Sequence, residues 1–129
     1  MDLTLVDVDG KKVSLDQVAG DQLLLLYFWA TWCKPCRKAQ PKVAALAEKY
    51  KDMVKVVGIN VGELDSPKDI KKYISRQKIT YTMLIDHNDE AVKKFSVAAI
   101  PVIILLDETG KILFRDHEPP ANLDKFFSE

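Results

Sequence analysis

The sequence predicts an α/β protein with a mixed central β-sheet flanked by helices. Two observations support this prediction. Short apolar runs, which are typical of buried strands, alternate along the chain with segments of helical periodicity. The chain then continues into two strand-like runs joined by a turn at residues 107–110, which indicates an antiparallel hairpin. We expect residues 1–129 to form one domain, because the sequence shows no internal repeat, low-complexity tract or linker.

The predicted elements follow in order along the chain. Residues 3–6 and 12–15 flank the turn Asp9-Gly10 and indicate an N-terminal β-hairpin. Further strands are expected at residues 23–28, 54–61, 81–85, 102–106 and 111–115. Helices are expected at residues 34–50, after Ser66, where serine caps and Pro67 begins the helix, and at residues 90–95. The tail from residue 119 is expected to form a last short helix over the sheet.

Composition argues against nucleic-acid binding as the main function, although it leaves a local basic patch open. Lysine plus arginine equals aspartate plus glutamate at 19 each, so no overall charge attracts the protein to nucleic acid or anionic lipid. No apolar run approaches the roughly 20 residues that span a bilayer. The first residues lack a basic region followed by an apolar stretch, so no signal peptide is expected. Either the protein is cytosolic, or a leader has been left out.

The two cysteines, Cys33 and Cys36, predict a redox-active pair. A disulfide between them closes a very small loop and would constrain the unfolded chain little. A structural zinc site needs four ligands, and only the distant His87 and His117 remain. A haem-attachment site would need histidine where Arg37 stands. Two cysteines that merely pack in the core would fit poorly in the charged "CKPC" loop.

The position of the pair suggests different tasks for its two members. Cys33 is expected at or just before the first turn of a helix, where unpaired amides and the helix dipole favour a thiolate. Lys34 and Arg37 add positive charge nearby. Cys36 lies one turn further in and is expected to be more shielded from solvent. We therefore expect Cys33 to attack a disulfide and Cys36 to resolve the mixed disulfide, with Pro35 stiffening the turn between them.

The segment "FWATWCKPC" resembles the active-site signature of the thioredoxin superfamily. The N-terminal hairpin, "NVGE" and a central helix–strand insertion before Ile100-Pro101 make the chain most similar to the TlpA/ResA-like branch. The resemblance implies a thioredoxin-like fold and an extracytoplasmic thiol-disulfide oxidoreductase, periplasmic or membrane-tethered. This branch is often linked to cytochrome c maturation. The resemblance also implies a monomeric protein that reduces protein disulfides and is itself re-reduced by a thiol donor such as a membrane thiol carrier.

Carried over by residue, the resemblance makes Cys33 the nucleophile and Cys36 the resolving cysteine, with no other cofactor and no metal. It implies a cis peptide bond before Pro101, whereas the sequence alone also fits an ordinary trans proline that begins a strand. The backbone of Ile100 would then pair with an extended substrate segment. The residues expected to contact substrate are Trp32, Lys34, Pro35, Ile100 and Pro101.

Glu63 is the expected proton acceptor. Thioredoxins carry a buried aspartate six residues before the first cysteine, and Tyr27 occupies that position here. Glu63, in "INVGEL", matches the glutamate near the cysteines of ResA-like proteins. Burial would raise its pKa toward a range useful for taking the Cys36 proton. The alternative is a solvated loop glutamate, and an unchanged pH profile in Glu63→Gln would exclude the catalytic role.

Two other classes of function are alternatives. A peroxidase of the peroxiredoxin type shares the hairpin and the insertion, but Ala30 stands where its proline-x-x-x-threonine-x-x-cysteine pattern needs threonine. A copper-carrying or purely partner-binding thioredoxin-like module is the other. Copper-delivery relatives have three residues between their cysteines, and this chain has two.

Overall fold

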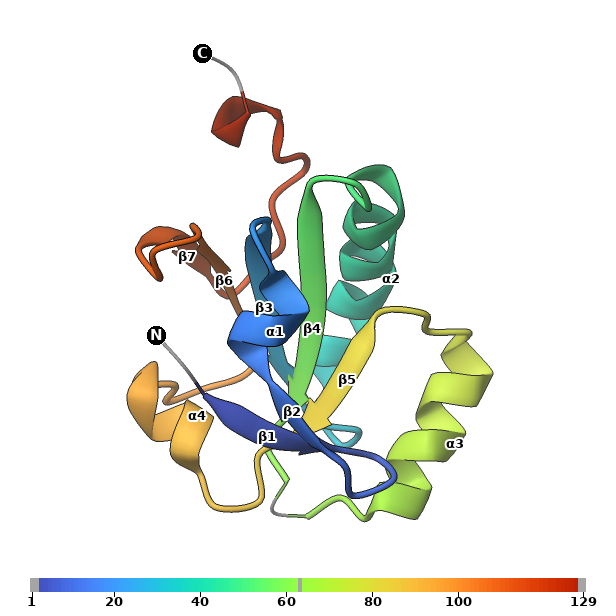
Figure 1. Cartoon of the computed structure of the whole chain (residues 1–129). Coiled ribbons are helices and arrows are strands. Elements are labelled where there is room, and N and C mark those ends of the chain that lie inside the picture. The colour runs from blue at the N-terminus through green and yellow to red at the C-terminus, as the bar shows by residue number, and fades with distance from the viewer. Residues whose placement is uncertain (1–2, 63, 128–129) are drawn as a thin grey trace.

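The sheet at the centre of the fold is mixed and flanked by helices, as the sequence predicts. In the computed structural model, which describes residues 3–62 and 64–127, the strands are β1 (Thr4–Asp7), β2 (Lys12–Ser14), β3 (Leu23–Trp29), β4 (Val54–Asn60), β5 (Thr82–Ile85), β6 (Val102–Leu106) and β7 (Ile112–Asp116). The helices are α1 (Leu15–Ala19), α2 (Lys34–Lys49), α3 (Pro67–Gln77), α4 (Glu90–Lys94) and the short 3-10 helix η1 (Asp124–Phe126). The strand order is β2-β1-β5-β4-β3-β6-β7 (Figure 1).

Strand β3 lies inside the sheet and is covered on both faces. It pairs in parallel with β4 and antiparallel with β6. Because successive side chains of a strand point to opposite faces, Tyr27 and Trp29 join one apolar cluster and Leu26 and Phe28 join another. The first cluster includes residues of α2 and α3, and the second includes residues of α1 and α4 (Figure 1). The prediction of a central strand buried on both sides is therefore confirmed.

The helix ends follow the capping signals of the sequence. Ser66 Oγ accepts a hydrogen bond from the Asp69 amide at 3.1 Å, and Pro67 is the first residue of α3. The structure also contains α1, which the sequence analysis missed. Ser14 caps α1 by accepting a hydrogen bond from the Gln17 amide at 3.4 Å. The hairpin strand expected over residues 12–15 therefore ends at Ser14.

The register of the strands brings three segments to one edge of the sheet. Trp29, the last residue of β3, lies opposite Asn60, the last residue of β4. Val102, the first residue of β6, lies opposite Phe28. At this edge therefore lie the turn into α2, the loop after β4 and the segment before β6.

Across residues 3–62 and 64–127, no helix combines the length and the apolar character that crossing a membrane requires.

The C-terminal tail returns to the apolar cluster that contains α2. Leu123 is fully buried, and its amide donates a hydrogen bond to the Tyr50 hydroxyl at 2.8 Å. Phe127 stacks on the Tyr50 ring with centroids 5.8 Å apart. The short helix expected in this tail is thus present as η1, which is a single 3-10 turn.

Candidate active site

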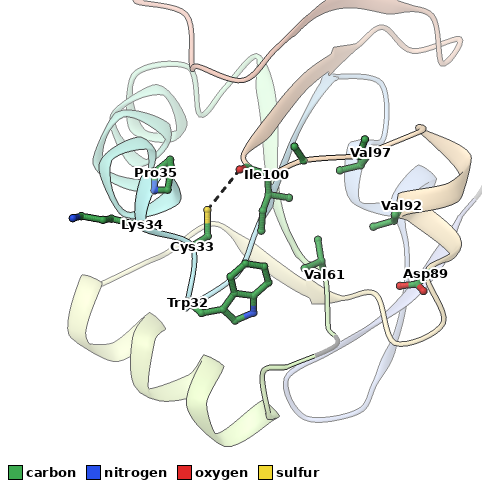
Figure 2. Close-up of a pocket in the computed structure, with 11 residues that line it drawn as sticks. Trp32, Cys33, Lys34, Pro35, Val61, Asp89, Val92, Val97 and Ile100 are labelled. Atoms are coloured by element: carbon green, nitrogen blue, oxygen red, sulfur yellow. Dashed lines mark hydrogen bonds between the residues drawn. The ribbon is translucent and has the colours of Figure 1, made fainter.

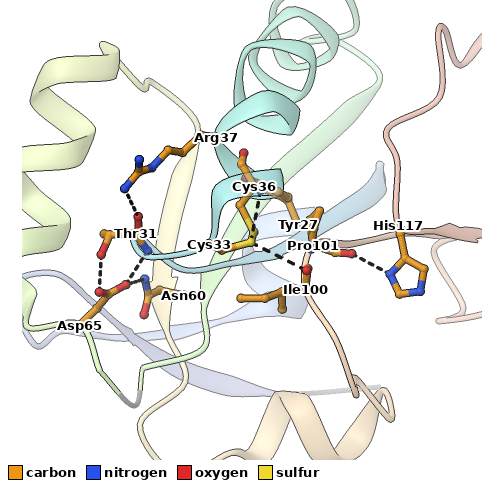
Figure 3. Close-up of a disulfide and its surroundings, with 10 residues drawn as sticks. All are labelled: Tyr27, Thr31, Cys33, Cys36, Arg37, Asn60, Asp65, Ile100, Pro101 and His117. Atoms are coloured by element: carbon orange, nitrogen blue, oxygen red, sulfur yellow. Dashed lines mark hydrogen bonds between the residues drawn. A yellow bond between two sulfur atoms is a disulfide. The ribbon is translucent and has the colours of Figure 1, made fainter.

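Cys33 and Cys36 are joined by a disulfide at the start of α2 (Figure 3). Cys33 is the N-cap residue of this helix, and its amide donates to the Ala30 carbonyl at 3.2 Å. The Cys36 amide donates to Cys33 Sγ at 3.2 Å. The first sulfur is thus held against an N–H group that the helix itself leaves unpaired. The placement that the sequence predicts for Cys33, just ahead of the first helical turn, is confirmed.

The two sulfur-bearing residues differ in their access to solvent. Cys33 is 4% exposed and lines a cavity of about 560 Å³, whereas Cys36 is completely buried. Trp32, which is 51% exposed, flanks Cys33 at the mouth of this cavity (Figure 2). The rest of the wall is largely apolar and includes Val61 and Ile100. A reactant that enters this cavity therefore meets Cys33 before Cys36.

The place of Lys34 next to Cys33 in the sequence suggests an ammonium close to Cys33 Sγ, but the structure does not put it there (Figure 2). Its side chain extends away from Cys33, although it lines the outer part of the same cavity (Figure 2). Local positive charge at Cys33 Sγ therefore comes first from the helix N-terminus and its amides, and less from the Lys34 ammonium.

The Ile100–Pro101 peptide bond is cis, as the resemblance implies. The carbonyl oxygen of Ile100 lies 3.8 Å from Cys33 Sγ (Figure 3). His117, which follows β7 directly, places Nδ1 2.9 Å from the carbonyl oxygen of Pro101. In the sequence, His117 stands between a predicted strand and two prolines, as an ordinary loop residue does. Its contact joins the start of the C-terminal tail to the segment that faces the disulfide, and no local signal in the sequence marks it.

Tyr27 lies directly behind the disulfide. Its hydroxyl donates to the Cys36 carbonyl at 2.8 Å, and the side chain is fully buried. Burial raises the pKa of Tyr27 far above its ordinary value, and the neighbouring Tyr81 and Tyr73 hydroxyls raise it further. Tyr27 is therefore a neutral hydrogen-bond donor, and it cannot serve as the proton acceptor that an aspartate would provide at this place.

Asp65 is a further residue of the site that the sequence analysis missed. Its buried carboxylate accepts hydrogen bonds from the Thr31 amide at 2.7 Å and from the Asn60 side-chain amide at 2.8 Å. The Thr31 hydroxyl donates to the same carboxylate, and Arg37 donates to the Thr31 carbonyl at 3.2 Å. Thr31 is thus held from both sides, two residues before Cys33 (Figure 3).

The structure brings most of the expected site residues together. One cavity is lined by Trp32, Cys33, Lys34, Pro35 and Ile100. Pro101 follows Ile100 and is buried, and Cys36 lies behind Cys33. Glu63 lies outside the described residues, so its role stays a prediction. Within residues 3–62 and 64–127, no three His, Cys, Asp or Glu side chains form a group that could hold a metal ion.

Residues 1–115 match the model of the AhpC/TSA family. The chain belongs to the AhpC/TSA family. It is also similar to the thiol-disulfide oxidoreductase ResA of Bacillus thuringiensis subsp. konkukian (strain 97-27). The two are 32% identical over 110 residues, which cover 84% of this chain and 62% of that relative. This member of the AhpC/TSA family thus spans about three fifths of the length of the ResA proteins that it matches.

Solved structures give the same fold for this AhpC/TSA chain. StoA from Bacillus subtilis has a TM-score of 0.78 and 25% identity, and the match covers 93% of this chain and 90% of StoA. The thioredoxin domain of a thiol-disulfide oxidoreductase from Bacteroides vulgatus has a TM-score of 0.79 and 25% identity, with coverage of 92% and 86%. The predicted thioredoxin-like fold is therefore confirmed.

Proposed function

We propose that this protein is a thiol-disulfide oxidoreductase that reduces disulfides in partner proteins. The observation that supports this most directly is the disulfide at the N-terminus of α2, with Cys33 facing a cavity and Cys36 enclosed behind it. Cys33 is the nucleophile in this proposal, and Cys36 is the resolving cysteine. The similarity to thiol-disulfide oxidoreductases supports the same activity.

The reaction starts from the reduced protein. The Cys33 thiolate attacks one sulfur of the partner's disulfide, so that a mixed disulfide forms and one partner thiolate leaves. Cys36 then loses its proton, and its thiolate attacks Cys33 Sγ. The second partner thiolate leaves, and the Cys33–Cys36 disulfide remains. Two electrons pass to the partner, whose two thiolates take up two protons.

The backbone of this site favours the first step. The Cys36 amide, 3.2 Å from Cys33 Sγ, can donate to a thiolate at that sulfur, and the helix dipole adds to its stabilisation. An extended partner segment would lie in the cavity beside Trp32 and pair with the backbone of Ile100. Pro35 and Pro101 would keep the backbone rigid on the two sides of this cavity.

An upstream thiol donor must return the two electrons, because the cycle leaves Cys33 and Cys36 oxidised. By similarity to ResA, we propose a membrane thiol carrier for this step and an extracytoplasmic site of action, periplasmic or tethered to the outer face of a membrane. We further propose that its partners act in cytochrome c maturation. The protein is proposed to act as a monomer. Glu63 is proposed to accept the Cys36 proton.

Thiol trapping across a series of glutathione and dithiothreitol ratios tests the activity. We expect one reversible two-electron couple, with a midpoint potential below that of glutathione. In a matched pair of variants, Cys36→Ser should accumulate a mixed disulfide with a disulfide-containing protein, and Cys33→Ser should not. A midpoint well above the glutathione couple would indicate an oxidant, and no reversible couple would exclude the enzyme. Thiol-dependent consumption of peroxide by the parent protein would favour the peroxidase.

A further inference from the structure

A second depression of the surface begins on the other side of Trp32. It has a volume of about 710 Å³ and lies between the first turns of α2 and the neighbouring face of α3. We call it the basic groove, and the side chains that matter in it are Trp32, Arg37, Asp69, Lys72, Tyr73 and Arg76. Trp32 also lines the cavity at Cys33, so one exposed indole separates the basic groove from the disulfide.

The basic groove carries an excess of positive charge in a chain whose net charge is zero. Three cations line it, Arg37, Lys72 and Arg76, against the single carboxylate of Asp69. Lys72 and Arg76 are four residues apart on α3, so they project from one face of that helix. All three cations are exposed to solvent.

These charges are not neutralised within the described part of the chain. There, the ion pairs join Lys51 to Glu48 and Lys71 to Asp9, and neither involves a residue of the basic groove. Arg37 donates one hydrogen bond to the Thr31 carbonyl, which is a neutral acceptor (Figure 3). The guanidinium charge of Arg37 therefore remains available to an external anion.

We propose that the basic groove binds an acidic segment of the partner protein next to the disulfide that is reduced. This inference rests on the proposed function and adds the chemical class of the substrate. Once the partner's disulfide sits at Cys33, the chain on one side of it can pass Trp32, which borders both the cavity and the basic groove. Carboxylates in that segment would then meet Lys72, Arg76 and Arg37. Such exposed charges act mainly on the rate of encounter and on its salt dependence.

Two synthetic peptides with the same internal disulfide serve as probes. One carries aspartate and glutamate on both sides of the disulfide, and the other carries asparagine and glutamine at the same positions. The reduced protein is mixed with each peptide, and kcat/KM is measured with dithiothreitol as the donor, after the rate of direct reduction without protein is subtracted. We expect a higher kcat/KM for the acidic peptide at about 10 mM salt, and a ratio close to one at about 1 M salt, where screening extends only about 3 Å.

The variant Lys72→Gln/Arg76→Gln tests the basic groove itself. The variant loses two exposed ion pairs with the acidic peptide. The ratio of kcat/KM for the acidic peptide to kcat/KM for the neutral peptide should therefore fall by about fivefold. The matched control is Lys51→Gln/Lys55→Gln, an exposed pair with the same spacing along the chain and the same change in charge. These lysines line a separate depression near the start of β4, away from the end of the sheet that carries the disulfide, and the control should leave the ratio unchanged.

The outcomes separate the inference from the function on which it rests. If the parent protein reduces both peptides at equal rates in low salt, the acidic preference is wrong and the oxidoreductase activity stands. If the two double variants lower the ratio equally, the preference comes from net charge and the basic groove is not its site. If the parent protein reduces neither peptide, the proposed function fails and this inference falls with it.

Discussion

Truncation of Asp65 should destabilise the turn ahead of Cys33. In Asp65→Ala, the Asn60 side-chain amide loses its acceptor in a place with no access to solvent. A buried donor without a partner costs about 1–3 kcal/mol, and a hydrogen bond to a charged group contributes about 1.5–3 kcal/mol. The half-buried Thr31 amide can turn to water, so we take the lower end of each range. The free energy of unfolding should fall by about 2.5 kcal/mol.

Urea unfolding of the oxidised protein, followed by tryptophan fluorescence, measures this loss. With a slope of about 2 kcal/mol per M, the midpoint should fall by about 1.3 M. Asp21→Ala removes an exposed carboxylate and serves as the control, with an expected change within about 0.5 kcal/mol. Equal midpoints for Asp65→Ala and Asp21→Ala would refute the view that Asp65 holds the turn.

Two other perturbations test the surroundings of the site. Burial raises the pKa values of Tyr27 and Tyr81 above the ordinary value of 10.0, so their protonated forms are favoured in the folded state. Their contribution to stability is complete below pH 10 and should be lost as pH rises further. Urea midpoints measured between pH 8 and about 11 should therefore fall, and an unchanged midpoint over this range would contradict the prediction. Gly62→Ala should destabilise by more than about 2 kcal/mol, because Gly62 has a φ of +81° and an added Cβ would lie 2.8 Å from the Asp86 carbonyl oxygen. Gly10→Ala, with a φ of +83° and open space around the Cβ, isolates the conformational cost, and thermal unfolding that is equal in both variants would show that the close contact is harmless.

The features predicted correctly are those with a strong local signal. Strand β3 is a continuous apolar run, and α2 repeats its apolar residues over sixteen positions. The helix α1 has five residues, which is too short for a periodic pattern, although Ser14 and Gly20 mark its two ends. The pairing of β1 with β5 had no signal either, because it involves only two pairs of residues far apart in the chain.

The same distinction applies to the candidate site. The sequence by itself determined that Cys33 caps α2 and that Cys36 lies one turn inside, because a separation of three residues equals about one helical turn. Only the tertiary structure decided which groups surround the pair. It places the Ile100 carbonyl beside Cys33 across 67 residues of chain, and the Asp65 carboxylate at Thr31 across 34 residues.

The basic groove is also a product of tertiary structure, because α2 and α3 each supply part of it. In the sequence, Lys72 and Arg76 belong to the charged run 68–78, a pattern that predicts the solvated face of a helix. That expectation holds for the helix but does not say what lies opposite. Periodicity determines which side of a helix is polar, whereas the packing of helices on a sheet determines which polar sides meet.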